Sequence, residues 1–239
     1  MRGTLYFLIV TLLLPLVAGA QTAAQSNQDP HRPACTTTRC RKIESFLKKH
    51  YCGASPFGNG SDDGCDIKSV ERPQIGVDVI AEYWCEWNEK KEADECKQSG
   101  QPSSAVRALL VGELHRLGLP LKADGETHFT VWKSAHSGWT VAKAAYTRVN
   151  GAELDLCEVI GIIDEASHIV VVRKLPFHKT NVDVPDVTDW SLVDLADVES
   201  DGTEDVILQG DGYEDHWFEV VSIRGGAIRT IFSGLGYYL

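Results

Sequence analysis

The second half of the chain alternates apolar and polar residues over short runs. Residues 126–133 and 139–149 are two such runs, and Asn150-Gly151 marks a tight turn before the next one. Further apolar or alternating runs lie at 160–163, 168–173, 190–196, 205–209, 213–223 and 227–232. A period of two is typical of strands, and short links favour pairing between neighbours. The pattern therefore predicts a meandering antiparallel sheet.

Two earlier segments have the spacing of amphipathic helices. In residues 38–51, the apolar side chains Ile43, Leu47 and Tyr51 fall on one side. Residues 103–117 follow a proline, begin with a serine that can cap a helix and end at Gly118. Both segments are therefore predicted to be helical.

The cysteines are concentrated before residue 100. Six of the seven lie there, namely Cys35, Cys40, Cys52, Cys65, Cys85 and Cys96. Six cysteines allow fifteen pairings, and polar loops that cannot bury themselves favour local bonds. The preferred set is Cys35–Cys40, Cys52–Cys65 and Cys85–Cys96, with Cys157 left as a buried thiol. Zinc is disfavoured because no Cys-x-x-Cys pair is present. The predicted fold is α+β: mostly antiparallel β-sheet with a disulfide-stapled helical N-terminal region.

The N-terminus has the layout of a cleavable secretory signal. Arg2 precedes an apolar run, and small residues follow at Ala18-Gly19-Ala20. An uncleaved anchor is disfavoured because the run is short for a membrane span. The predicted organisation is a signal peptide at 1–20, a flexible leader at 21–34, a Cys-rich N-terminal region at 35–100 and, at 101–239, a helix plus an antiparallel β domain. We expect a secreted or periplasmic protein.

Charge narrows the range of partners. Acidic residues outnumber basic ones by 34 to 23, and the formal net charge is −11, which argues against nucleic acid as a partner. Residues 181–223 contain thirteen acidic and no basic residues, whereas residues 32–50 contain six basic residues and one acidic residue. The acidic stretch either attracts calcium or a basic partner, or is balanced internally by the basic helix.

One acidic loop has the spacing of a calcium site. Counting Asp197 as position one, carboxylates fall at positions 1, 3, 5 and 9, a glycine falls at 6, and a threonine can offer its carbonyl at 7. Without a counter-ion these carboxylates would repel one another. The predicted ligands of Ca²⁺ are Asp197, Glu199, Asp201, Thr203 and Asp205. The alternative is an acidic Asp-Gly turn between strands.

The loop is not an EF-hand, because Leu208 occupies position 12 and the flanking runs are strand-like. A strand, this loop and another strand together resemble the FG-GAP calcium loops of integrin-type proteins. The resemblance covers residues 192–210 and implies the same five ligands. It carries over the loop and not the β-propeller, because the chain has a single copy of the motif.

No established catalytic signature is present in the sequence. We therefore predict an exported, disulfide-containing calcium-binding protein of binding or structural type, with a protein or glycan as its partner. The alternative is an extracellular, carbohydrate-active hydrolase that uses Asp211, Glu214, Asp215 or His216 beside a structural calcium. Placement discriminates between the two: a hydrolase needs His216 and Trp217 in a concave pocket with a second carboxylate in reach.

Overall fold

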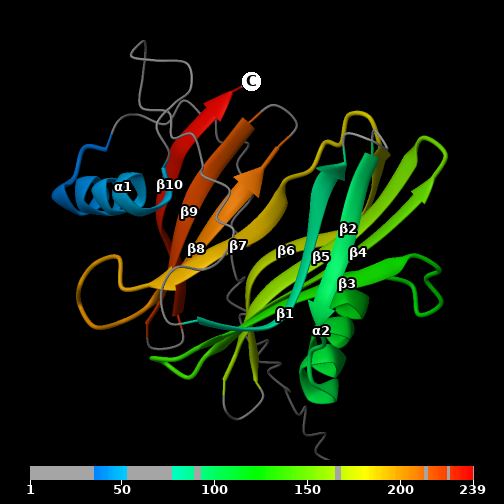
Figure 1. The fold of residues 1–239 in the computed structure, drawn as a ribbon, viewed down its shortest axis with the longest axis horizontal. Coiled ribbons are helices and arrows are strands. Elements are labelled where there is room, and N and C mark those ends of the chain that lie inside the picture. The colour runs from blue at the N-terminus through cyan, green and yellow to red at the C-terminus, as the bar shows by residue number, and fades with distance from the viewer. Residues whose placement is uncertain are drawn as a thin grey trace, which may run out of the picture. The chain divides into compact units, whose positions relative to one another are not determined.

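The strands of the computed structural model form two antiparallel sheets (Figure 1). The structure describes residues 35–52, 77–88, 93–164, 168–212, 215–224 and 227–238, which belong to one unit spanning residues 33–239. The predicted signal peptide at 1–20, the leader at 21–34 and the loop between Cys52 and Cys65 lie outside the described residues.

The larger sheet has six strands in the order β2-β1-β3-β4-β5-β6. Its strands are β1 (Val77–Asn88), β2 (Ala93–Gly100), β3 (Glu126–Ser134), β4 (Thr140–Asn150), β5 (Glu153–Ile163) and β6 (Ile169–Asn181). Gly151 has a positive φ of 64° in the turn between β4 and β5, as the Asn-Gly pair predicts. The predicted hairpin between β5 and β6 also forms, with Ile163 opposite Ile169.

The smaller sheet has four strands in the order β10-β9-β8-β7. Its strands are β7 (Asp189–Ala196), β8 (Asp205–Asp211), β9 (Asp215–Arg224) and β10 (Ala227–Tyr238). The prediction of mostly antiparallel β-sheet is therefore confirmed, but the strands are divided between two sheets where the sequence suggested one. The division falls between β6 and β7, which are consecutive in the chain.

Apolar side chains join the two sheets face to face. Val141 and Ile160 of the larger sheet share one buried cluster with Val206 and Leu208 of the smaller sheet. Alternate residues of the same strands point to the outer faces, because side chains along a strand alternate. Each outer face is covered by one helix.

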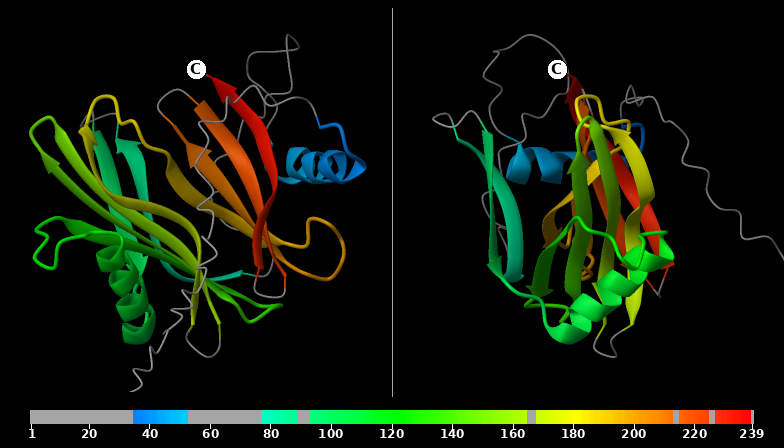
Figure 2. Two further views of the ribbon diagram at one scale, coloured as in Figure 1. Left: turned by 180° about the vertical axis from the view of Figure 1, so that it is seen from behind. Right: turned by 90° about the vertical axis from the view of Figure 1, so that its right-hand side faces the viewer.

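The two helices, α1 (Thr38–Tyr51) and α2 (Ser104–Arg116), pack on different sheets (Figure 2). Ile43, Leu47 and Tyr51 of α1 are fully buried against the smaller sheet. Leu110 and Leu114 of α2 are fully buried against the larger sheet. Side chains cap both helices at the predicted starts, since Thr37 accepts from the amide of Cys40 and Ser103 from that of Val106.

The N-terminal region is helical only in part. It contains α1 but also β1 and β2, which the sequence pattern did not predict. β2 lies at the edge of its sheet and its residues from Cys96 to Gly100 are exposed, so no buried face imposes an apolar alternation on it. β1 pairs with β3 as well as β2, so residues 77–100 belong to the same sheet as the strands that follow α2.

The disulfide pattern agrees with the prediction where it is described. Cys35 is bonded to Cys40, and Cys157 is a buried free thiol. Cys52 and Cys96 each take part in a disulfide bond. The strand register sets Cys96 directly opposite Cys85, the partner that was predicted for it. Disulfides are consistent with an oxidising compartment. None of the helices in the described part of the chain is long and apolar enough to span a membrane.

Candidate functional site

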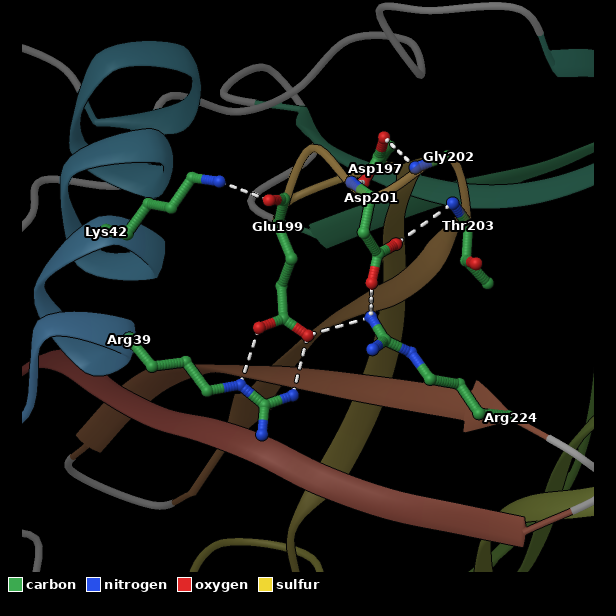
Figure 3. Close-up of polar contacts among 8 residues, drawn as sticks. All are labelled: Arg39, Lys42, Asp197, Glu199, Asp201, Gly202, Thr203 and Arg224. Carbon is green, nitrogen blue, oxygen red and sulfur yellow. Dashed lines mark hydrogen bonds and ion pairs between the residues drawn. The ribbon is translucent and has the colours of Figure 1, made fainter.

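The acidic loop connects β7 to β8 and is shaped by its own aspartates (Figure 3). Asp197 Oδ1 accepts a hydrogen bond from the amide of Asp201 at 2.9 Å, and Oδ2 accepts one from the amide of Gly202 at 2.7 Å. Asp201 Oδ1 in turn accepts from the amide of Thr203 at 3.1 Å. Gly202 has a φ of 84°, which glycine adopts with little strain. The side chains thus fix the sharp turn that the sequence predicted.

Glu199 is held by basic residues from distant parts of the chain. Its carboxylate accepts two hydrogen bonds from Arg39 of α1, at 2.5 and 2.6 Å, and one from Arg224 of β9 at 2.8 Å. The ammonium of Lys42 donates to the Glu199 backbone carbonyl. The hydrogen bonds from Arg39 are the main reason why the pKa of Glu199 lies below its ordinary value. Glu199 is therefore surrounded by cationic side chains of the protein itself.

Arg224 also forms an ion pair with Asp201, so one guanidinium bridges two of the predicted metal ligands. Figure 3 shows the carboxylates of Glu199 and Asp201 directed toward Arg224, whereas that of Asp197 is turned to the backbone at Gly202. Among the described residues, no three carboxylate, histidine or cysteine side chains converge as a metal-binding group. Much of the expected repulsion is thus relieved by arginine.

Asp205 differs from the other aspartates of the predicted calcium site, whose carboxylates have hydrogen-bond or ion-pair partners. It is fully buried, and neither of its carboxylate oxygens has a hydrogen-bond partner among the described residues. Burial is the main cause that raises its pKa to about 6, and the negative charges of Glu199 and Asp201 add to the rise. The hydroxyl of Ser222 lies opposite and limits the rise, although it forms no hydrogen bond of normal geometry. Asp205 is thus a buried carboxylate that forms no ion pair with any cation of the described residues, although the charge of Arg224 also limits the rise of its pKa.

A cavity of about 410 Å³ adjoins the loop. Its lining comes from α1, the β3–β4 turn, the end of β7 and the loop itself: Phe46, His136, Leu195, Ala196, Asp197, Gly202 and Glu204. Glu204, at position eight of the loop, is only 8% exposed. The spacing of calcium ligands does not include this position, so Glu204 was not among the predicted site residues.

The stretch proposed for the hydrolase makes contacts within the protein. His216 Nδ1 is paired with Asp211 Oδ1, which also accepts from Gln209 at 2.6 Å. The Trp217 ring packs edge-on against Trp190 with centroids 5.5 Å apart. Neither His216 nor Trp217 lines the cavity beside the loop. Glu214 lies outside the described residues, and so does the side chain of Asp215.

A second charged cluster joins the two sheets: Lys143 and Glu158 are largely buried, whereas the side chain of Asp189 is 62% exposed. Lys143 Nζ lies 2.8 Å from Glu158 Oε2 and 2.8 Å from Asp189 Oδ1, and it donates to the Trp190 carbonyl at 2.5 Å. Burial raises the pKa of Glu158 to about 8, against the opposing effect of Lys143. The charge of Lys143 keeps the pKa of Asp189 below its ordinary value. This cluster was not predictable from the sequence pattern, because its members lie on three different strands.

The charge pattern of the sequence indicated the basic partners of the loop only in part. The basic stretch at 32–50 and the acidic stretch at 181–223 were expected to attract a partner or to balance one another, and the contacts of Arg39 and Lys42 with Glu199 support internal balance. Arg224 was not anticipated. None of the family models, curated proteins or solved structures compared with the chain matches it.

Proposed function

We propose that this chain is an exported protein that binds calcium at the loop 197–205 and acts by binding or structural support, not by catalysis. The observation that carries the proposal is Asp205, whose two carboxylate oxygens are fully buried without a hydrogen-bond partner among the described residues. A buried carboxylate without a compensating partner destabilises the folded state, and a bound cation removes that penalty. Calcium prefers carboxylate and carbonyl oxygens.

The loop suits calcium in a second respect. The Asp197 carboxylate accepts hydrogen bonds from the amides of Asp201 and Gly202, so the backbone of the loop is already held in a tight turn. In the proposal, the ion takes oxygens of Asp205 and Asp201, with Asp197, Glu199 and the Thr203 carbonyl as the further predicted ligands. Because Arg224 contacts both Glu199 and Asp201, calcium has to compete with this guanidinium. Binding is therefore expected to strengthen where that competition is weakened.

The expected role of calcium is to fix the corner where α1 meets the β7–β8 loop. Arg39 and Lys42 reach this loop from α1, while the apolar side of the same helix packs on the smaller sheet. The acidic surface around the loop then presents a defined shape to a basic protein or to a glycan that contacts the ion. The hydrolase alternative has less support, because His216 and Trp217 engage Asp211 and Trp190 instead of lining the described cavity.

Thermal unfolding with and without calcium tests the proposal. Extracellular calcium modules and sensors span dissociation constants of roughly 10⁻³ to 10⁻⁷ M, and we take ~10 μM as a middle value. At ~1 mM calcium the linkage stabilisation is then ~2.7 kcal/mol. For a domain of this size that corresponds to a rise of about 5–11 °C in Tm over chelator-treated protein. Magnesium should have a much smaller effect, because it releases its waters reluctantly.

Two substitutions serve as a matched pair. Asp201→Ala removes a predicted ligand and should abolish most of the calcium-dependent rise in Tm. Asp186→Ala removes an exposed aspartate that pairs with His178 outside the loop, and it should leave the rise intact. A Tm that is indifferent to calcium and chelator, or an equal response of the two variants, would show that the loop is an arginine-braced turn and not a metal site.

A further inference from the structure

The cavity beside the loop combines an apolar wall with buried negative charge. Phe46, Leu195 and Ala196 supply the apolar side, and Asp197 and Glu204 supply two carboxylates. A volume of about 410 Å³ is within the range of small-molecule sites and is large enough for one long side chain. The residues around it come from three separate parts of the chain, so the cavity exists only in the folded protein.

Glu204 is held in place by a chain of hydrogen bonds. Its Oε2 accepts from the Ser134 hydroxyl at 2.7 Å. The Ser134 oxygen itself accepts from the amides of His136 and Ser137, both at 3.0 Å. Because both acceptor positions of the hydroxyl are taken, its single proton is directed to Glu204. This carboxylate is therefore oriented by the β3–β4 turn of the other sheet.

The second oxygen of this carboxylate has no partner in the described part of the chain. Glu204 lines the cavity, and its Oε1 is buried without a hydrogen-bond partner among the described residues. Both oxygens of Asp197, in contrast, already accept backbone amides of the loop. A ligand that enters the cavity therefore meets the glutamate that carries this unsatisfied acceptor, a second acidic side chain and an aromatic ring. These features favour a cation that carries its own apolar surface.

We propose that this cavity binds an ammonium group on an apolar stem, from either a free amine or a lysine side chain. The ammonium donates to Glu204 Oε1, and the stem packs against Phe46 and Leu195. A guanidinium fits less well, because its planar fork of donors is best matched by two acceptor oxygens and only one oxygen of Glu204 lacks a partner among the described residues. A neutral apolar molecule leaves the buried oxygen unsatisfied. The site does not depend on the calcium proposal.

Ligand titration of the full folded protein in the presence of a calcium chelator tests this site. The probes are n-butylammonium, n-butylguanidinium, neutral 1-butanol and Nα-acetyl-lysine N-methylamide, followed by amide chemical shifts in NMR spectra. We expect n-butylammonium to bind at least about tenfold more tightly than 1-butanol, as a hydrogen bond between charged groups implies. It should also bind more tightly than the guanidinium. If the lysine derivative binds more tightly than n-butylammonium, the natural ligand is a lysine side chain. If n-butylammonium binds more tightly, the natural ligand is a free amine.

Variants locate the bound group. Glu204→Gln keeps the acceptor for Ser134 but removes the charge, and it should weaken n-butylammonium about tenfold or more. Glu153→Gln makes the same chemical change at an exposed position on β5 and should have no effect. Phe46→Leu should weaken binding to a smaller extent, because the aromatic face is lost. Equal affinity for ammonium and alcohol, no binding at millimolar concentration, or the same response of the two glutamine variants would overturn the proposal. The chelator keeps this outcome separate from any failure of calcium to bind.

Discussion

The inner cluster around Lys143 and the outer cluster around Arg224 both place one basic residue between two acidic ones. In the inner cluster, Lys143 contacts Glu158 and Asp189, and each acidic side chain has this cation beside it. In the outer cluster, Arg224 contacts Glu199 and Asp201, but a third carboxylate, Asp205, is buried without a hydrogen-bond partner among the described residues. The difference separates a cluster in which each carboxylate has a cation beside it from one that contains a buried carboxylate without such a contact among the described residues, and this carboxylate is where we propose that calcium binds.

The largest effect is expected for Lys143→Met. This substitution removes the hydrogen bonds and the charge of Lys143 from Glu158, Asp189 and the Trp190 carbonyl, and the free energy of unfolding should fall by about 2–3 kcal/mol. The value stays below the cost of stranding a buried charge, because Glu158 already holds a proton at neutral pH and the Asp189 side chain is largely exposed. Urea unfolding followed by circular dichroism measures it. Lys174→Met, at an exposed position on β6, should change the stability by less than about 0.5 kcal/mol. Equal effects of the two variants would show that the inner cluster adds nothing to stability.

Asp205→Asn should have the opposite sign. In the presence of a chelator, removal of a buried charge should raise the free energy of unfolding by about 1–2 kcal/mol. The new amide can donate to Ser222, whose hydroxyl also lacks a hydrogen-bond partner among the described residues. The same variant should lose the calcium-dependent rise in Tm. Destabilisation in chelator would mean that Asp205 is satisfied within the protein and would remove the main support for calcium.

The inner cluster should also make the stability of the protein depend on pH, through the titration of Glu158. Burial raises the pKa of Glu158 to about 8, so the folded state holds a proton that the unfolded chain releases near its ordinary pKa. The resulting stabilisation is fully present below the ordinary pKa and is lost as pH rises through 8. Between pH 7 and 8.5 the free energy of unfolding should fall by about 1 kcal/mol. Denaturant unfolding of Glu158→Gln should show a flatter profile, and a profile identical to that of the unsubstituted protein would refute the assignment.

The smallest effect on stability is expected for Arg39→Gln. Arg39 is half exposed, and loss of its ion pair with Glu199 should reduce the free energy of unfolding by about 0.5 kcal/mol. Calcium affinity should rise at the same time, because one cation no longer competes for Glu199. Isothermal titration with calcium measures this, and Lys49→Gln on an exposed part of α1 is the control. Weaker calcium binding by the Arg39 variant alone would mean that Arg39 positions the loop for the ion instead of competing with it.

Local features of the fold were predictable from the sequence. The helix at 38–51 was predicted to the residue, and the Asn-Gly turn and the hairpins followed from alternation and turn residues. The Cys35–Cys40 bond was predicted as the pair that remained once Cys52, Cys65, Cys85 and Cys96 had been assigned to local bonds. The division into two sheets was not predictable, because alternation shows only which residues share a face. It does not show which sheet faces which, so the break between β6 and β7 has no local signal.

The site shows the same limit. Asp197 and Gly202 shape the turn as their spacing predicts, since these contacts span only a few residues. Arg39, which binds the Glu199 carboxylate, lies 160 positions away in the chain. The spacing of acidic residues within the loop could not reveal that an arginine would contact this carboxylate. Glu204 was missed for a related reason: its importance comes from Ser134 on the other sheet and not from the loop in which it lies.

The long separation between Arg39 and Glu199 has a consequence for biosynthesis. A chain that emerges N-terminus first presents α1 well before β7 to β10 have been made. Until those strands form, Ile43, Leu47 and Tyr51 have no apolar face to cover them, although the Cys35–Cys40 bond is local and can close at once. Contacts of such high sequence separation form late because the intervening chain must first be ordered. The first helix of the described chain is therefore expected to dock last, and a nascent chain halted before β10 should expose it to chaperones.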